Sequence, residues 1–346
     1  MQSFSTPDNA AHHIMPLGVA IVTFQSADVI EGCLDSLLAS KDTIAKVVIT
    51  DNASTDDTCQ VVSEWAKRHS DAISFKCYEV GDSSRDEAWL TLLIAPMNGG
   101  FAYATNRSLE LLYQAPEINL FWLVNPDCRI APETAAQYIE AGKDQQFSLM
   151  GGRTVFEEHR DTVQTDGGRV SVWTGVCESV NWGVPIASAT FPGAQSLDFI
   201  TGANCVASRR FIDEVGFMEE DYFLYYEEVD WAFRRGNLPL RVVPEATVWH
   251  FGGTSIGTGS VGRRPSPFAN YFNYRNRVRF MVRFNRSGLP IAFAFAFAKA
   301  FQLLLKGAPD EAHALIAGLL GLRPPEQVAA VLSPKARTLA FGELSA

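Results

Sequence analysis

The sequence predicts an α/β fold with a mostly parallel central sheet flanked by helices, followed by a helical C-terminal region. Three observations lead to this prediction. Short, fully apolar segments alternate in the first half with segments whose apolar residues recur at helical spacing. Polar clusters stand directly after several of the apolar segments, as happens at the carboxyl ends of parallel strands. From about residue 268 onward the pattern is helical.

The strands expected in the first half are short and almost entirely apolar. They cover residues 17–24, 46–50, 90–96 and 120–124. Such continuous apolar runs are typical of strands that are buried on both faces of a parallel sheet.

Helices are expected between these strands. After the first strand, apolar residues from Ile30 to Leu38 keep helical spacing, and Asp28 is placed to cap that helix. A second helix is expected through Val62 and Trp65, and a third over residues 101–113.

The pattern weakens after about residue 150. Residues 151–195 are rich in Gly, Thr and Ser and predict irregular hairpins, and "LRVVPEATVWHFGGTS" predicts two short strands and a glycine turn. We therefore expect a sheet-containing domain over residues 15–265 and a helical region over residues 266–346.

Composition and charge restrict the class of protein. Of 346 residues, 47% are apolar and 20% charged, which is typical of a globular chain. The formal net charge of -10 argues against nucleic acid as a partner, because phosphate binding needs basic surface. The six cysteines are scattered without a C-x-x-C pair, which favours reduced thiols over disulfides or a zinc site.

Two segments bear on targeting. The N-terminus lacks a basic region followed by an apolar one, so no signal peptide is expected. The apolar segment 289–305 is shorter than the roughly 20 residues that span a bilayer, and it contains Lys299. It is either a helix buried on the domain or a helix lying in a membrane interface; we favour association without spanning.

Polar residues follow three of the predicted strands. They are Thr23, the pair Asp51 and Asn52, and the "NPD" segment that ends in Asp127. Each alone would be an ordinary turn or helix cap. Because the carboxyl ends of parallel strands meet at one edge, a shared polar pocket is favoured over three separate turns.

The chemistry of these residues suits a sugar nucleotide. Asp51 and Asn52 offer the acceptors and donors that match a uracil or thymine base and a ribose. A divalent cation held by Asp127 would neutralise a departing diphosphate.

Several segments together resemble family 2 glycosyltransferases. These are "VVITDNASTDDT", "NGGFAYATN", "FWLVNPD", "ITGANCVASRRFIDEVGFMEEDYFLYYEEVDWAFR" and "HFGGTS", which stand in the expected order over about residues 17–285. The subset that they most resemble contains the rhamnosyl- and galactofuranosyltransferases of bacterial surface polysaccharide. The resemblance implies a GT-A fold, a Mg²⁺ or Mn²⁺ cofactor and inversion at the anomeric carbon.

The resemblance also assigns residues to the donor site. Asp127 corresponds to the last acidic position of the family's D-x-D motif, and Asn125 stands where the first acid would be, which leaves one strong carboxylate ligand. The residues that it places at the nucleotide or elsewhere in the donor site are Thr23, Asp51, Asn52, Asn98 and Asn106.

The "YYEEVD" segment offers three candidates for the base that accepts the acceptor's proton: Glu227, Glu228 and Asp230. Burial among aromatic side chains would raise a carboxyl pKa, as this role requires. On a helix, residues 227 and 230 share a face and 228 points elsewhere. The family's base corresponds to Glu228. The alternative is that these acids only cap a helix.

Three further residues carry weaker signals. His250 ends an apolar strand and is either structural or, as the resemblance implies, a metal contact. Arg275 and Arg277 lie among aromatic residues and either form a solvated basic face or bind phosphates of the donor or of a lipid diphosphate acceptor.

The expected function is transfer of a single sugar from a dTDP- or UDP-activated donor to a glycan or polyprenyl-diphosphate-linked acceptor. A rhamnose- or galactofuranose-like sugar is favoured. The expected location is the cytoplasm, peripheral to the inner face of the cell membrane. The Q-x-x-R-W motif of processive synthases is missing, which favours one addition per encounter.

Two other functions fit the sequence less well. A sugar-nucleotide nucleotidyltransferase would need a glycine-rich, lysine-bearing loop after the first strand, where this chain has "TFQSADVIEG". A non-catalytic sugar-nucleotide-binding module would have no need to keep both Asp127 and the "EEVD" cluster.

Overall fold

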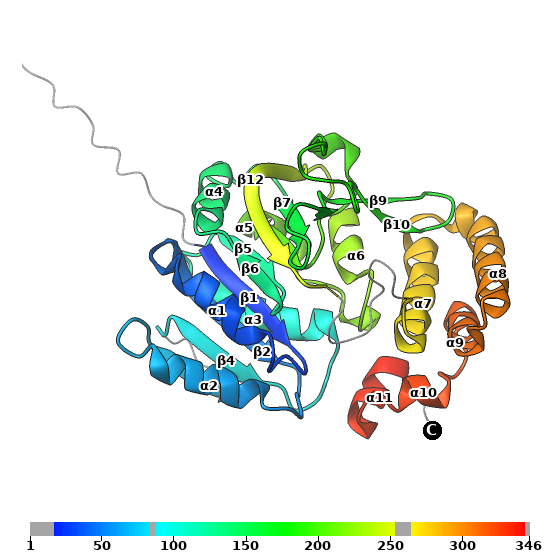
Figure 1. Ribbon diagram of the computed structural model, residues 1–346, viewed down its shortest axis with the longest axis horizontal. Coiled ribbons are helices and arrows are strands. Elements are labelled where there is room, and N and C mark those ends of the chain that lie inside the picture. Colours follow the sequence, from blue (N-terminus) through cyan, green and yellow to red (C-terminus); the bar gives the residue numbers. More distant parts are fainter. Residues whose placement is uncertain (1–16, 83–86, 253–263, 343–346) are drawn as a thin grey trace, which may run out of the picture.

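The computed structural model describes residues 17–82, 87–252 and 264–342. Within them a single large sheet contains ten strands, in the order β3-β4-β2-β1-β5-β11-β7-β12-β6, with β8 paired to β7 (Figure 1). A separate two-stranded ribbon is formed by β9 and β10. The N-terminal residues on which the signal-peptide expectation rests, and the end of "HFGGTS", lie outside the described residues.

The first five strands of this order are parallel. Four of them match the predicted segments, because their apolar residues are buried on both faces of the sheet. The bounds are β1 (Leu17–Thr23), β2 (Ile44–Asp51), β3 (Phe75–Glu79), β4 (Leu90–Ile94) and β5 (Leu120–Val124). Strand β3 was not predicted, because it is an edge strand whose residues are partly or fully exposed.

The second half of the sheet is mixed. Strand β11 runs antiparallel to both β5 and β7, and β12 runs parallel to β7. The bounds are β6 (Cys128–Ile130), β7 (Leu149–Phe156), β8 (Val163–Thr165), β9 (Gly168–Val170), β10 (Cys177–Ser179), β11 (Asn204–Ser208) and β12 (Arg241–His250).

Two predictions about this half were wrong in part. Residues 151–156 belong to β7, a buried strand inside the sheet, rather than to an irregular hairpin. The two adjacent glycines of β7 interrupt the apolar pattern by which a strand is recognised in the sequence. Glycine is needed at position 152 because a Cβ there would lie 2.1 Å from the carbonyl oxygen of Ala246. Strand β12 is one strand rather than two, with a register shift between Val242 and Thr247 that accommodates Pro244.

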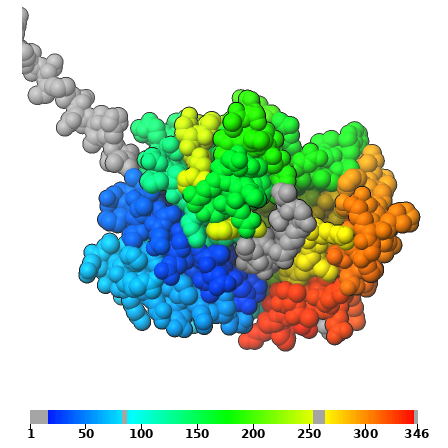
Figure 2. All heavy atoms as spheres, viewed as in Figure 1, coloured from blue at the N-terminus to red at the C-terminus, as the bar shows by residue number. Residues whose placement is uncertain are grey.

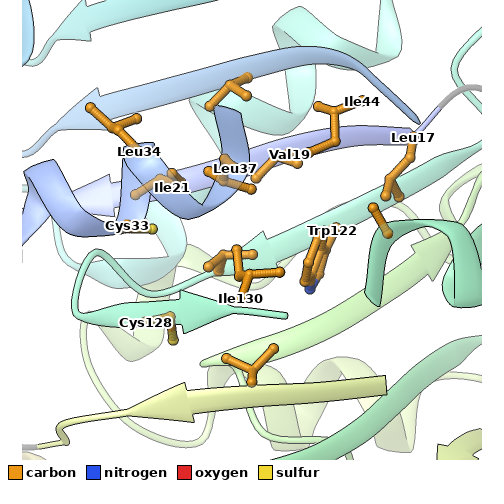
Figure 3. Packing of buried hydrophobic residues seen from close by; sticks show 14 of the residues in the cluster. Leu17, Val19, Ile21, Cys33, Leu34, Leu37, Ile44, Trp122, Cys128 and Ile130 are labelled. Carbon is orange, nitrogen blue, oxygen red and sulfur yellow. The ribbon is translucent and has the colours of Figure 1, made fainter. Parts of the chain in front are cut away.

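Helices cover the sheet, and their apolar faces form the core. Figure 3 shows Cys33, Leu34 and Leu37 of α1 next to Val19 and Ile21 of β1. The helices of this part are α1 (Ile30–Leu38), α2 (Thr58–Arg68), α3 (Phe101–Tyr113), α4 (Thr134–Ala141), α5 (Arg209–Val215) and α6 (Glu227–Phe233).

The predicted cap of the first helix was wrong. Helix α1 starts after Val29, with no side-chain cap, and the carbonyl of Ser26 accepts the N–H groups of Val29 and Ile30. The backbone turn at Ser26 therefore replaces the Asp28 side chain as the first acceptor.

The C-terminal region is helical, as predicted. It contains α7 (Pro267–Phe284), α8 (Leu289–Leu305), α9 (Pro309–Leu319), α10 (Glu326–Ala329) and α11 (Pro334–Phe341). These helices lie on the side of the molecule away from α1 and α2 (Figures 1 and 2). Helix α7 joins them to the sheet, because Phe280 and Met281 share a buried cluster with Trp231 of α6.

Helix α8 is apolar and largely uncovered. With the short turn before it, residues 286–305 form a 20-residue segment that is long and apolar enough to cross a membrane by length and composition, and 28% of an apolar 18-residue window within it is buried. Helix α8 itself has the 17 residues expected from the sequence, and the turn before it lengthens the continuous segment to 20. A single helix of this kind also occurs in soluble proteins, so association with a membrane stays a prediction.

Candidate functional site

A cavity of about 360 Å³ opens where the carboxyl ends of β1, β2 and β5 meet the C-terminal helices. This edge includes the topological switch between β1 and β5, where ligands bind in open α/β sheets. Its wall combines amides and carboxylates from the sheet with apolar side chains from the helices. The polar or charged residues that line it are Ser26, Asn52, Asn98, Asn125, Asp127, Gln164, Thr165, Ser179, Thr201, Glu227, Glu228 and His250.

The three predicted polar clusters meet at this edge. Thr23 is paired with Asp51 in the register of β1 and β2, and its Oγ1 donates to Asp51 Oδ1 at 2.9 Å. Both side chains are fully buried below the cavity floor, and Asp51 also accepts from the amide and the hydroxyl of Ser54. Asn52, not Asp51, therefore faces the cavity.

Asn52 organises the turn that follows β4. Its Nδ2 donates to Asn98 Oδ1 at 2.9 Å and to the carbonyl of Gly100, and its Oδ1 accepts from Gly99 N. Gly100 has φ +92°, and a Cβ there would lie 2.3 Å from the carbonyl oxygen of Phe223. Only glycine allows this close approach, which brings the turn against the segment leading to Glu227.

Asn106 lies away from the cavity. Its side chain is buried in α3 and bonds both the N–H and the carbonyl of Met218, as well as Glu220 Oε1. The structure therefore gives Asn106 a role in fixing the segment after α5, rather than the predicted place in the donor site.

Asp127 and His250 form a pair that could hold a metal ion. Asp127 Oδ1 lies 3.1 Å from His250 Nε2. Gln164 Oε1 lies 2.6 Å from His250 Nδ1 and can accept a hydrogen bond from it, which orients the ring with Nε2 toward Asp127. Asn125 Nδ2 also lies 3.2 Å from Nε2. Gln164 was missed from the sequence, because it stands in a segment without a periodic pattern.

The charge state of Asp127 suits a cation. Burial raises the pKa of its carboxyl, but the charge and hydrogen bond of His250 outweigh burial, and the net pKa is lowered. Cys128 lies close to both residues. Its thiol, however, is buried in the core and donates to the carbonyl of Ala203, and burial raises its pKa well above the usual range. A carboxylate oxygen and an imidazole nitrogen fit Mg²⁺ or Mn²⁺.

Glu227 and Glu228, in the first turn of α6, line the same cavity. Burial, and then the charge of Glu228, raises the pKa of Glu227 well above its ordinary value. Burial likewise raises the pKa of Glu228. One buried oxygen of each carboxylate, Oε2, has no hydrogen-bond partner among the described residues. These are the properties of a general base in a desolvated pocket.

Asp230 is separated from these two carboxylates. It is fully buried and bonds Tyr222 Oη, Arg234 Nε at 2.7 Å and Arg283 Nη1 at 2.9 Å. It does not line the cavity. The expected sharing of a face by residues 227 and 230 therefore does not describe the site: Glu227 and Glu228, adjacent in the first turn of the helix, both line the cavity, and Asp230 does not.

The segment before α6 is strained and held from α7. Phe223, Tyr225 and Tyr226 all have positive φ values, between 62° and 73°. Asn276, a fully buried residue of α7, donates through Nδ2 to the carbonyls of Tyr222, Leu224 and Tyr225 at 2.6 to 3.0 Å. Sequence reasoning missed Asn276, because a lone amide in a helix carries no signal of its distant partners.

The two arginines of α7 are not in this cavity. Arg275 donates to the carbonyls of Tyr222 and Ala340 and stacks on Phe272, and burial lowers its pKa to about 10. Arg277 lines a second pocket, between α7 and α8. Neither is placed to contact a donor phosphate in the first cavity. A further unpredicted residue, Trp182, lines its rim and is 44% exposed.

This fold is that of the GT-A glycosyltransferases: a mostly parallel sheet flanked by helices, with the cavity at the carboxyl ends of its strands. The chain belongs to glycosyl transferase family 2, whose family model matches residues 18–216. No curated protein sequence matches the chain significantly.

Solved structures support the fold assignment. GalNAc-T7, solved with UDP, GalNAc and Mn²⁺, matches 89% of this chain at 12% identity with a TM-score of 0.54; the match covers 56% of GalNAc-T7, little more than half of it. The mannosyltransferase PcManGT from Pyrobaculum calidifontis, in complex with GDP-Man and Mn²⁺, matches 94% at 15% identity, with a TM-score of 0.51 and 83% of its own chain covered.

A third structure is S. aureus TarS 1-349 in complex with UDP-GlcNAc. It matches 95% of this chain at 17% identity, with a TM-score of 0.50 and 89% of its own chain covered. At identities of 12% to 17%, these matches support a shared fold and do not indicate a shared substrate.

Proposed function

We propose that this chain is an inverting glycosyltransferase that moves one sugar from a dTDP- or UDP-activated donor to a glycan or lipid-linked acceptor in cell-surface polysaccharide synthesis. A rhamnose- or galactofuranose-like sugar is favoured by the motifs that the chain shares with such enzymes. One observation carries the proposal: a metal-competent pair, Asp127 and His250, and two protonatable carboxylates, Glu227 and Glu228, line the same cavity.

The carboxylates supply the base. Glu228 accepts the proton of the acceptor hydroxyl, and the freed oxygen lone pair forms a bond to the anomeric carbon of the donor. The bond from that carbon to the diphosphate oxygen breaks on the opposite face, and the nucleoside diphosphate leaves with the electron pair. Configuration at the anomeric carbon is therefore inverted.

The donor's negative charge calls for a cation. No Lys or Arg is among the described residues that line this cavity. Asp127 and His250 would hold a divalent ion, Mg²⁺ or Mn²⁺, which when bound neutralises the diphosphate. The turn that Asn52 and Asn98 hold lines the cavity and would contact the nucleoside, and the exposed ring of Trp182 offers an apolar face to a sugar.

The metal assignment can be tested with Asp127→Ala. Loss of the carboxylate removes a metal ligand, so we expect transfer to be lost and donor binding to weaken by at least about tenfold, the usual cost of losing a charge-assisted contact. Donor binding is measured by calorimetry with and without Mn²⁺, and transfer by release of nucleoside diphosphate.

Cys128→Ser is the matched control, because it keeps the position next to Asp127 but lies in the core. It should retain the Mn²⁺ dependence of donor binding. Full transfer by the unaltered protein in excess chelator would contradict the metal assignment, and donor binding without any donor hydrolysis or transfer would favour a non-catalytic binding module.

A further inference from the structure

A second pocket, of about 290 Å³, lies between α7 and α8. Tyr225 lines both this pocket and the first cavity, so the strained segment that leads into Glu227 separates the two. Its lining is polar and basic: Tyr225, Arg264, Pro265, Ala269, Asn270, Asn273, Tyr274, Arg277, Lys299, Gln302, Leu303 and Lys306.

The pocket carries an excess of positive charge. Four cationic side chains line it, and no carboxylate is among its described lining residues. Lys299 Nζ donates to Gln302, and Arg264 Nη1 donates to the carbonyl of Lys306, so both bonds go to uncharged groups. The lining as a whole thus attracts an anion.

Arg277 is the central feature. It is 6% exposed, its Nε donates to Tyr226 Oη at 3.1 Å, and its Nη2 donates to Asn273 Oδ1 at 2.9 Å. Its guanidinium lies over the ring of Tyr274, and its Nη1 has no hydrogen-bond partner among the described residues. Burying a guanidinium that has an unused donor and no carboxylate beside it costs free energy of desolvation, which a bound anion would offset.

The surroundings indicate which anion fits. A guanidinium fork flanked by ammonium groups is suited to phosphoryl oxygens. Phe295 stands one turn before Lys299 on the same face of α8 and is 43% exposed, and Leu305 next to Lys306 is 73% exposed. A phosphate that reaches this pocket therefore arrives along an apolar surface, as the head of a lipid does.

We propose that the α7–α8 pocket binds the phosphate or diphosphate group of a lipid-linked acceptor, with Arg277 as the buried contact and Lys299 and Lys306 at the rim. The inference rests on the proposed function and names its acceptor class. Binding there would place the lipid on α8 and direct the attached sugar past Tyr225 toward Glu228.

The test measures binding rather than transfer. Phosphatidylcholine vesicles that carry a long-chain isoprenyl diphosphate are compared with vesicles brought to equal surface charge by phosphatidylglycerol. Co-sedimentation of the full-length protein should be stronger with the isoprenyl diphosphate. The double variant Lys299→Ala/Lys306→Ala should lose this preference, with a drop in affinity of about tenfold or more. Arg277→Lys should lose it as well, because an ammonium lacks the fork.

The control is Lys67→Ala/Lys76→Ala, which removes the same charge from α2 and β3 on the far side of the molecule (Figure 1). It should keep the preference. Equal binding to both kinds of vesicle would overturn the proposal in favour of a general anionic surface, and competition by inorganic phosphate alone as strong as by isoprenyl diphosphate would overturn the lipid assignment.

Folding and the proposed function are checked separately. Melting curves show whether Arg277→Lys folds; the two lysines are exposed, so their variant tests the pocket even if Arg277→Lys does not fold. Calorimetry with the donor nucleotide reports on the first cavity. If the unaltered protein does not bind the donor nucleotide, the proposed function is contradicted. If it binds the donor nucleotide but shows no preference for the isoprenyl diphosphate vesicles, the proposal for the pocket is contradicted.

Discussion

At the scale of single residues, the two carboxylates that begin α6 differ from ordinary surface acids. Both lie in the cavity, both have a buried oxygen without a described partner, and burial raises the pKa of each. Because a negative charge on one carboxylate disfavours a negative charge on the other, we expect Glu227 and Glu228 to be protonated in two linked steps.

Glu228→Gln keeps the size of the side chain but removes its basicity. We expect kcat to fall by roughly 10² to 10⁴, the usual range for loss of a general base, while donor affinity barely changes. Steady-state kinetics and donor calorimetry measure the two quantities.

The pH dependence follows from the direction of the pKa shifts. A base must be deprotonated to act, so activity falls as pH is lowered through its pKa. Because the pKa of Glu228 lies above its ordinary value of 4.5, the fall in kcat/KM of the unaltered protein should begin at a higher pH than for an exposed glutamate. If Glu228→Gln keeps near-normal turnover and Glu227→Gln is inactive, the base is Glu227 and not Glu228. If both variants are active, neither glutamate is the base.

The sequence placed most of these residues near one another but could not assign their orientation. Asp51, Asn106 and Asp230 have the same chemistry as the cavity residues Asn52 and Glu228, yet they do not line the cavity and instead bond buried residues around it. The partners of Asn106 and Asp230 include residues that are 112 and 53 positions away in the chain, so no local pattern could reveal them.

At the scale of elements, α7 supports the segment that carries the carboxylates. The three carbonyls that Asn276 satisfies belong to residues 222–225, which contain two of the left-handed positions. A strained segment persists only when its surroundings hold it, and here one buried amide supplies much of that hold.

Asn276→Ala should therefore disturb both stability and catalysis. Arg275 still donates to the carbonyl of Tyr222, so the main loss is the amide donor at the carbonyls of Leu224 and Tyr225. Each lost hydrogen bond to a buried carbonyl costs about 1 to 3 kcal/mol, partly offset by relaxation, so we expect the free energy of unfolding to fall by about 2 to 4 kcal/mol. Urea denaturation measures this loss, and transfer kinetics should show kcat falling further than donor affinity.

Asn119→Ala provides the comparison, because the Asn119 side chain donates locally to the carbonyl of Glu117. Its effect should stay within about 0.5 kcal/mol. If Asn276→Ala is as stable and active as Asn119→Ala, the segment holds its shape without α7.

The elements themselves could be predicted where a single pattern dominated. The segment over residues 101–113 formed α3, and four of the five parallel strands were found, because continuous apolar runs and helical spacing are local signals. Strands β3 and β7 were missed, since exposure at an edge and glycines in a buried strand both erase that signal.

At the scale of the whole molecule, the outer face of α8 is the largest group of exposed apolar side chains that one described helix presents. They are Ile291, Phe295, Phe297, Phe301, Leu304 and Leu305. An apolar face of this kind favours contact with a lipid interface, and the proposed peripheral location depends on it.

The double variant Phe301→Glu/Leu305→Glu should weaken sedimentation with anionic vesicles. Each side chain buried in the interface contributes about 1.5 to 3 kcal/mol, so the partition coefficient should fall at least tenfold. Both residues are more than 60% exposed, so the fold should tolerate the change.

Leu339→Glu, at an exposed position of α11, is the matched control and should sediment normally. Equal sedimentation of both variants would show that α8 does not meet the lipid. Point substitutions are preferable to truncation after α7, because Val331 and Leu332 line the reaction cavity and would be removed with the helix.

By itself the sequence determined the fold class and the edge of the sheet that carries the candidate site, because apolar periodicity and turn-forming polar clusters are recorded locally along the chain. The family was indicated by the resemblance of its motifs to family 2 glycosyltransferases. Only the tertiary structure decided which of the like side chains face the cavity, that α7 holds the strained segment, and that Arg277 lies in a separate basic pocket. Those outcomes depend on contacts between residues far apart in the chain, and burial there turns chemically similar acids, amides and arginines into either structural partners or accessible groups.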